Sequence, residues 1–290
     1  MEQNAEQQTR CGFVALIGAP NAGKSTITNN FVGSKVSIVS PKVQTTRTMV
    51  RGIGVYEQTQ IIFIDTPGIF KPKRRLDRAM VSSAWSGVKD ADIVVLVVDA
   101  KRGFDDETQS IVAKLNKQKI EAILVLNKVD LIAKEKLLGL SAQINAAGNF
   151  KETFMISALT GQNIEDFYKY LADNLPVSPW YYPEEQMSDM PLKLLAAEIV
   201  REKLFLYLRQ ELPYELTVEP ELWERREDGS VRAEMTIYVK RDNQKIGQSA
   251  RREIETELDE RVHLFLFVKV RENWIDDPAR YSAWNLDFNS

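Results

Sequence analysis

The feature that most constrains the fold is a glycine-rich turn between a strand-like run and a helical run. Residues 18–25 read GAPNAGKS, which fits the pattern G-x-x-x-x-G-K-[ST], and the apolar run FVALI precedes them. Such a turn lets consecutive backbone N–H groups face inward, and the helix that follows adds a favourable dipole. In this context the pattern predicts a phosphate-binding loop rather than an ordinary glycine turn that opens a helix.

The first 180 residues alternate short apolar runs with longer amphipathic runs. The runs that predict strands are 12–18, 60–65, 92–99, 121–127 and 153–157. The runs that predict helices include 23–32, 105–117 and 163–175. Buried strands alternating with helices predict an α/β domain with a mainly parallel sheet covered on both faces. Ligands of such sheets bind at the carboxyl ends of the strands, where each motif described below falls.

A cluster of prolines between residues 176 and 191 predicts a domain boundary, because neither a helix nor a central strand runs easily through proline. The charge balance changes there as well: residues 1–180 carry 22 Lys and Arg against 18 Asp and Glu, whereas residues 181–290 carry 16 against 23. The expected parts are a flexible N-terminus over 1–10, a first domain over 11–178, a linker over 179–190 and a second domain over 191–290.

The second domain shows a different pattern, which predicts a smaller α+β fold. Its expected elements, in order, are a helix over 191–211, strands over 214–223 and 231–240, a helix over 246–258 and a strand over 262–270. The two middle strands flank a turn, EDGS, whose residue types favour a hairpin.

Composition excludes several other kinds of site. With one cysteine, Cys11, and one histidine, His263, the chain can form neither a disulfide framework nor a zinc site rich in these residues, and a Ser-His-Asp triad in the first domain is excluded. No apolar run approaches the ~20 residues of a membrane span. The polar start MEQNAEQQTR does not resemble a secretion signal. We therefore expect a cytoplasmic protein.

Two motifs predict how a polyphosphate and its metal ion are held. Lys24 is expected to reach the outer phosphates, and the Ser25 hydroxyl is expected to ligate Mg²⁺. The sequence DTPG at 65–68 follows the strand QIIFID, so Asp65 is expected to be the second Mg²⁺ group and Gly68 to offer its N–H to the γ-phosphate. An aspartate at a strand end is otherwise an ordinary turn or cap residue.

A third motif predicts that the base is guanine. The sequence NKVD at 127–130 follows the strand EAILVL. Guanine presents two adjacent donors that adenine lacks, and the Asp130 carboxylate is the matching acceptor. Asn127 can join this segment to the phosphate loop, and the aliphatic stem of Lys128 can cover the flat ring. The segment 157–159 can present a backbone N–H to the base carbonyl.

In this order the motifs resemble the translation-factor-related GTPases. The segments that narrow the resemblance are SPKVQTTR at 40–47, REKL at 201–204, ELPY at 211–214 and VKVRENW at 268–274. They are similar to the Era family, bacterial GTPases with a C-terminal KH domain that assist maturation of the small ribosomal subunit. The resemblance spans about residues 12–275. It implies a P-loop GTPase domain followed by a KH-like domain, hydrolysis of GTP to GDP and phosphate, and small-subunit ribosomal RNA and the 30S subunit as partners.

The resemblance also implies switch residues and a second cation. Thr46 is the expected switch threonine that completes Mg²⁺ coordination, with Thr45 as the close alternative. Asn21 stands where related potassium-activated GTPases coordinate K⁺, although asparagine is also a common turn residue. Residues 70–78 are the expected second switch, and their charges could equally form a solvated face. Ile69 and Phe70 stand where other GTPases place a water-orienting glutamine, which predicts slow intrinsic hydrolysis.

These expectations define the candidate site. The expected catalytic residues are Asn21, Lys24, Thr46 and Gly68, and the expected Mg²⁺ ligands are Ser25, Thr46 and Asp65. The expected nucleotide-binding residues are Gly18, Ala19, Pro20, Asn21, Ala22, Gly23, Lys24, Ser25, Thr26, Asp65, Thr66, Pro67, Gly68, Asn127, Lys128, Asp130, Ser157, Ala158 and Leu159.

The second domain departs from the family pattern. KH domains clamp the nucleic-acid backbone with a G-x-x-G loop between two helices, and residues 191–290 contain no such sequence. Near 245–246 a strand end meets a helix interior without a turn, which indicates that about a dozen residues of the family pattern are missing there. Either the protein lacks them or the recorded sequence leaves them out. The remaining candidates for RNA contact are Lys240, Arg241, Lys245, Arg251 and Arg252.

Two functions therefore remain open. The first is a Mg²⁺-dependent GTPase switch that binds small-subunit ribosomal RNA and assists assembly of the 30S subunit. The second is a nucleotide-gated module that binds a protein or a membrane surface without binding RNA. The resemblance further implies a monomer and leaves open a peripheral association with the cytoplasmic face of the inner membrane.

Overall fold

The chain divides into two compact units. The computed structural model describes residues 8–40, 45–207, 216–239, 262–271 and 274–290. The first unit comprises Met1–Ser37, Thr46–Asp189 and Trp284–Ser290, and the second comprises Ile38–Thr45 and Met190–Ala283. The chain passes from the first unit to the second between Asp189 and Met190, at the end of the expected linker (179–190). The short segments 38–45 and 284–290 depart from the expected division, because each groups with the other unit.

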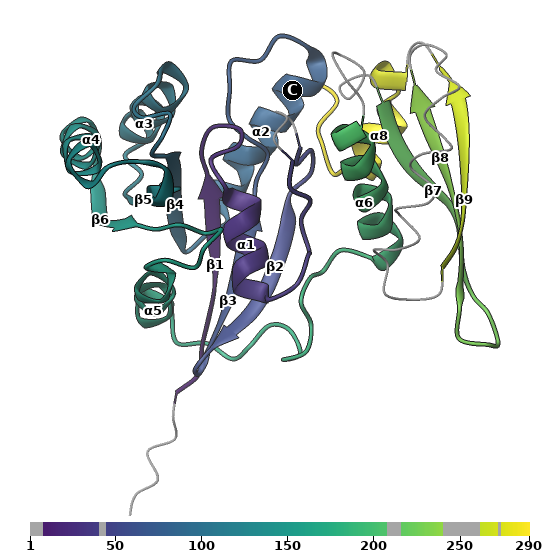
Figure 1. The fold of residues 1–290 in the computed structure, drawn as a ribbon, viewed down its shortest axis with the longest axis horizontal. Helices are drawn as coiled ribbons and strands as arrows, with labels where there is room; N and C mark the ends of the chain where they lie inside the picture. The colour runs from purple at the N-terminus through teal and green to yellow at the C-terminus, as the bar shows by residue number, and fades with distance from the viewer. Residues whose placement is uncertain (1–7, 41–44, 208–215, 240–261, 272–273) are drawn as a thin grey trace, which may run out of the picture. The chain divides into compact units, whose positions relative to one another are not determined.

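The first unit is built on a six-stranded sheet with the order β2-β3-β1-β4-β5-β6 (Figure 1). The strands are β1 (Arg10–Ile17), β2 (Val50–Tyr56), β3 (Thr59–Asp65), β4 (Ile93–Asp99), β5 (Ala122–Asn127) and β6 (Phe150–Met155). All neighbouring pairs are parallel except β2 and β3, which are antiparallel. β1 begins at Arg10, the last residue of the expected flexible N-terminus (1–10), and residues 1–7 lie outside the described residues.

Helices cover both faces of this sheet. They are α1 (Lys24–Val32), α2 (Arg75–Lys89), α3 (Asp106–Gln118), α4 (Lys134–Ala147) and α5 (Ile164–Asn174). Successive residues of β4 enter different hydrophobic clusters: Val95 packs with α1 and α5, whereas Leu96 packs with α2, α3 and α4. Because successive side chains of a strand point to opposite faces, the unit has three layers, with the sheet between two helical layers.

The second unit is a three-stranded sheet packed against one long helix. β7 (Leu216–Arg225) and β8 (Val231–Val239) are antiparallel, and β9 (Val262–Val270) runs parallel to β8. α6 (Leu192–Tyr207) packs on this sheet within one hydrophobic cluster. A short 3-10 helix (Trp274–Asp276) and α8 (Pro278–Ala283) follow. The strand predicted over 262–270 is confirmed, whereas the helix predicted over 246–258 falls outside the described residues.

Within the described ranges, no helix is both long enough and apolar enough to cross a bilayer.

Candidate nucleotide-binding site

The phosphate loop (residues 18–25) leaves β1 and enters α1 at the carboxyl edge of the sheet. Two of its glycines are required by geometry. Gly18 and Gly23 have φ values of +151° and +101°. A Cβ added at Gly18 would lie 2.2 Å from the Val97 carbonyl oxygen, and one added at Gly23 would lie 2.1 Å from Asn127 Nδ2. Only glycine therefore allows the loop to approach β4 and β5 this closely.

Lys24 turns its side chain back into the phosphate loop. Its Nζ donates hydrogen bonds of 3.1 Å to the carbonyl oxygens of Gly18 and Ala19, and the residue is only 6% exposed. Burial lowers the pKa of Lys24 from 10.5 to about 8, because the charged form has lost most of its contact with water. A polyphosphate at this position would favour the charged form of the lysine and raise its pKa again.

Three oxygen side chains expected to ligate Mg²⁺ lie together. Ser25 Oγ donates a hydrogen bond of 2.6 Å to Asp65 Oδ2 and lies 3.1 Å from Thr46 Oγ1. Asp65 is fully buried, and this burial raises its pKa, although hydrogen bonds from Ser25 and Ser37 act in the opposite direction.

The residues at this position fit Mg²⁺. Asp65 Oδ1 is buried and has no hydrogen-bond partner in the described part of the chain. Magnesium prefers oxygen ligands and usually keeps water molecules in its shell, so an ion or its bound water would satisfy this oxygen. The described ranges contain no group of three or more His, Cys, Asp or Glu side chains that could hold a metal ion, so this position has one carboxylate and hydroxyl groups.

The geometry favours Thr46 over Thr45 as the switch threonine. Thr46 is buried and its hydroxyl faces Ser25. Thr45 belongs to the second unit, where its carbonyl oxygen accepts a hydrogen bond of 2.5 Å from Arg201 Nη2. The intervening residues 41–44 lie outside the described residues.

The DTPG segment lies directly against the phosphate loop. The Ile69 N–H donates a hydrogen bond of 3.0 Å to the Gly18 carbonyl, and Thr66 Oγ1 donates one of 2.7 Å to the Leu16 carbonyl. A Cβ added at Gly68 would lie 2.8 Å from Pro20 Cα. A glycine is therefore needed at 68 for the two segments to touch.

The charged run that follows is exposed, as expected for a solvated face. The exposed cations are Lys71, Lys73, Arg74 and Arg75. The N–H groups of Lys73 and Arg74 each donate a hydrogen bond of 2.9 Å to Asp77 Oδ2. These bonds cap α2, so the expected second switch (70–78) is divided between a loop and the first turn of a helix.

Asn127 joins the base-site segment to the phosphate loop. Its Nδ2 donates a hydrogen bond of 2.9 Å to the Ala22 carbonyl, and its Oδ1 accepts bonds from the N–H groups of Lys128 (2.8 Å) and Ala158 (3.0 Å). The Ala158 N–H, one of those expected to reach the base carbonyl, therefore already has a partner. The adjacent residue, Leu159, is 82% exposed.

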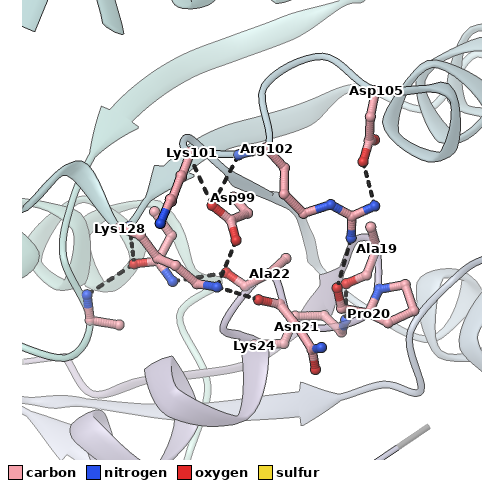
Figure 2. Close-up of polar contacts among 12 residues, drawn as sticks. Ala19, Pro20, Asn21, Ala22, Lys24, Asp99, Lys101, Arg102, Asp105 and Lys128 are labelled. Carbon is pink, nitrogen blue, oxygen red and sulfur yellow. Dashed lines mark hydrogen bonds and ion pairs between the residues drawn. The ribbon is translucent and has the colours of Figure 1, made fainter. Parts of the chain in front are cut away.

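Lys128 holds the same two segments through its ammonium group. The Nζ atom donates hydrogen bonds of 2.7 Å to Asp99 Oδ2 and 2.6 Å to the Asn21 carbonyl (Figure 2). Sequence reasoning missed Asp99, which ends β4 and so lies at the same edge of the sheet as Asn127. Its place at the end of an apolar strand was the signal that could have identified it.

The remaining expected residues occupy the same edge. Asp130 is exposed within a 3-10 helix (Val129–Leu131), where a ligand can reach its carboxylate. Thr66, Pro67 and Ser157 are buried, and Thr26 lies in the first turn of α1. The expected RNA-contact residues Lys240, Arg241, Lys245, Arg251 and Arg252 lie outside the described residues.

A phosphate loop, a buried carboxylate with two hydroxyls, and an accessible carboxylate after an Asn-Lys pair thus meet at the carboxyl ends of β1, β3 and β5. Together with the three-layer fold, they define a P-loop GTPase.

Comparison with known proteins identifies the family. A family profile described as "50S ribosome-binding GTPase" matches residues 13–128. GTPase Era of Mesorhizobium japonicum is 58% identical over 293 aligned residues, which cover 97% of this chain and 94% of that protein. GTPase Era of Sinorhizobium medicae gives the same identity and the same coverage of both chains. The chain belongs to the Era family of GTPases, and its identification as a GTP-hydrolysing enzyme is confirmed.

Two solved structures extend the likeness over nearly the whole chain. A variant of Aquifex aeolicus Era bound to GDP·AlF4⁻ is 35% identical, with a TM-score of 0.86 and coverage of 95% of this chain and 99% of that one. Era in complex with MgGDPNP and nucleotides 1506–1542 of 16S ribosomal RNA is also 35% identical, with a TM-score of 0.87 and coverage of 95% and 98%. The predicted fold, a GTPase domain followed by a KH-like α+β domain, is confirmed.

Proposed function

We propose that this chain uses GTP bound at the described site to control its association with small-subunit ribosomal RNA during assembly of the 30S subunit. The observation that carries the proposal is the hydrogen bond of 2.9 Å from Asn127 Nδ2 to the Ala22 carbonyl. It joins a segment suited to guanine to a loop suited to phosphates, so one ligand carrying both groups would contact both segments.

In this proposal each side chain has a separate role. Lys24 binds the outer phosphate oxygens, and the Gly68 N–H binds the γ-phosphate as charge develops on it. Ser25, Thr46 and Asp65 hold Mg²⁺, which supplies positive charge to the phosphate oxygens when bound. Asp130 accepts the two adjacent guanine donors, and the exposed backbone of Leu159 can serve the base carbonyl.

We further propose that hydrolysis is slow in the isolated protein and depends on K⁺. Neither Ile69 nor Phe70, which follow Gly68, carries a polar group that could orient water. The side chain of Asn21 is the proposed ligand of K⁺ beside the phosphates. Turnover measured in K⁺ and in Na⁺ tests this point, because equal rates in both would exclude a role for K⁺.

The RNA part of the proposal is supported by the relative that was solved with a 16S ribosomal RNA segment. It must also account for the missing G-x-x-G sequence. The comparison with the Mesorhizobium japonicum protein spans 293 aligned positions, whereas this chain has 290 residues. That relative therefore has residues without a counterpart here, and we propose that some of them belong to the shortened segment near 245–246.

RNA binding distinguishes the two functions that the sequence left open. We expect an RNA corresponding to nucleotides 1506–1542 of 16S ribosomal RNA to bind more tightly with a GTP analogue than with GDP, and a scrambled RNA of equal length to bind weakly. Lack of binding with either nucleotide, together with normal GTP turnover, would favour the alternative of a protein-binding or membrane-binding module.

The same family relationship supports a monomer that acts in the cytoplasm. We keep peripheral contact with the inner membrane as a secondary part of the proposal. Sedimentation of the GTP-bound protein with and without anionic lipid vesicles tests both points, because it reports the oligomeric state and lipid binding together.

A further inference from the structure

Three successive carbonyl groups of the phosphate loop accept hydrogen bonds from side chains outside the loop (Figure 2). The contacts are Arg102 Nη1 to Pro20 O at 3.2 Å, Lys128 Nζ to Asn21 O at 2.6 Å, and Asn127 Nδ2 to Ala22 O at 2.9 Å. Two of these donors belong to the predicted base motif. The third, Arg102, belongs to a loop that none of the predicted motifs includes.

Arg102 lies in the short loop between β4 and α3, and two carboxylates hold its guanidinium. Its Nη2 lies 2.6 Å from Asp105 Oδ2 and 2.9 Å from Glu107 Oε2. Asp105 is itself fixed, because its Oδ1 accepts a hydrogen bond of 2.9 Å from the Thr108 N–H and caps α3. A planar guanidinium bound on one edge by these carboxylates presents its other donor in a defined direction.

The direction of a carbonyl group determines the direction of the next N–H group. A trans peptide unit is planar, so its C=O and N–H point to opposite sides. Arg102 binds the Pro20 carbonyl at 3.2 Å, so the Asn21 N–H of the same peptide unit points away from Arg102. Inward N–H groups are the donors that a phosphate needs.

We propose that Arg102 is a positioning residue of the nucleotide site. Its guanidinium orients the peptide between Pro20 and Asn21 before a nucleoside di- or triphosphate binds, and it acts through the loop rather than on the ligand. The contribution is to preorganisation, since a loop that is already oriented loses less conformational entropy on binding. This inference rests on the proposed nucleotide site.

The test compares Arg102→Ala and Arg102→Lys with the unsubstituted full chain. A Lys101→Ala variant is the matched control, because Lys101 is an exposed neighbour whose backbone N–H, retained by alanine, binds Asp99 Oδ1 at 2.9 Å. Three quantities are measured: the Kd of GDP, the ³¹P chemical shifts of bound GDP, and the Tm of the nucleotide-free protein. The ratio of GTP affinity to ATP affinity reports the base site separately.

We expect Arg102→Ala to raise the Kd of GDP about tenfold, because losing one charge-assisted hydrogen bond to the loop lowers the population of its oriented conformation by about that factor. The ³¹P shift of bound GDP should change, because the loop N–H groups are reoriented, whereas the preference for GTP over ATP should not. Arg102→Lys should recover part of the affinity, since an ammonium still supplies one donor and one charge. Lys101→Ala should match the unsubstituted protein.

Either of two results would overturn the role of Arg102 without affecting the proposed function. The first is an Arg102→Ala variant with the GDP affinity and ³¹P shifts of the unsubstituted protein. The second is a loss of affinity that accompanies a lowered Tm while the ³¹P shifts stay unchanged. The second result would mean that Arg102 only stabilises the fold. Failure of the unsubstituted protein to bind GDP would instead overturn the proposed function, and this inference with it.

Discussion

Ser37 Oγ donates a hydrogen bond of 2.6 Å to Asp65 Oδ2, the same oxygen that accepts a bond from Ser25. Ser37 is buried in the segment between α1 and β2, and Asn29 fixes its backbone. Asn29 Oδ1 accepts the Ser37 N–H at 2.9 Å, and its Nδ2 donates to the Ser37 carbonyl at 2.7 Å. A side chain outside the predicted motifs therefore orients the carboxylate proposed to hold Mg²⁺.

We expect Ser37→Ala to raise the Mg²⁺ concentration that nucleotide binding requires. Loss of the hydroxyl leaves Asp65 Oδ2 with one fewer donor, so the carboxylate is less fixed. Removing a group that orients a metal ligand costs about 10–100-fold in metal affinity. Titration of GDP release against Mg²⁺ concentration measures the effect. Ser34→Ala, which alters an exposed serine of the same segment, should leave the titration unchanged. An unchanged midpoint in Ser37→Ala would contradict this role.

The motifs and most strands of the first unit could be predicted because their signals are local. The parallel strands β1, β3, β4 and β5 are apolar runs, and nucleotide motifs follow β1, β3 and β5, whereas only the second half of β6 (FKETFM) fits the pattern. β2 could not be predicted in this way, because Gly52 and Gly54 interrupt its pattern. A Cβ at Gly52 would lie 2.3 Å from Thr28 Cγ2, and one at Gly54 would lie 2.6 Å from Phe31. These glycines allow α1 to approach the strand, a reason visible only in three dimensions.

Three residues that support the site were not predicted from the sequence, because their contacts also depend on the three-dimensional fold. Ser37, Asp99 and Arg102 contact the site through partners 28, 29 and 82 positions away in the chain. Nothing in the immediate sequence of Ser37 or Arg102 distinguishes it from an ordinary loop residue, whereas Asp99 carries one local signal, its place at the end of the apolar strand β4. The motif residues were predictable because a phosphate or a base requires a fixed local pattern, whereas a supporting side chain can come from any element that folds nearby.

We expect Gly68→Ala to impair GTP hydrolysis more than GDP binding. The added methyl would lie 2.8 Å from both Pro20 Cα and Pro20 Cγ, so the DTPG segment must move away from the phosphate loop. Such overpacking costs about 1–3 kcal/mol, and it displaces the N–H proposed for the γ-phosphate. Turnover and GDP affinity measure the two effects. Gly139→Ala in α4, where an added Cβ meets nothing within 4 Å, is the control and should retain normal turnover.

We expect Asp130→Asn to change the preferred base from guanine to xanthine. An amide presents a donor where the carboxylate had only acceptors, and xanthine has a carbonyl in place of the guanine amino group. GTP affinity should fall about a hundredfold, because in the complex the amide donor of asparagine would meet a guanine donor and leave it without an acceptor. Competition between GTP and XTP for the nucleotide-binding site measures the base preference. Asp106→Asn, at an exposed position in the first turn of α3, should retain guanine specificity. Equal GTP affinity in both variants would exclude Asp130 as the base-reading residue.

Nucleotide binding should take up a proton at Lys24. Burial holds the pKa of Lys24 near 8 in the nucleotide-free protein, whereas its ordinary value is 10.5. Because the unfolded chain keeps this proton up to the higher pH, the free energy of unfolding contributed by this group rises with pH between these two values.

The affinity for GDP depends on pH in the opposite direction. Anionic phosphates favour the charged lysine, so GDP affinity should fall as the pH rises through 8. The expected uptake is about 0.1 proton at pH 7 and about 0.5 at pH 8. Calorimetry of GDP binding in two buffers of different ionisation enthalpy measures the uptake, and Lys101→Ala should leave it unchanged. Uptake that does not increase between pH 7 and pH 8 would mean that Lys24 remains fully charged before the nucleotide arrives.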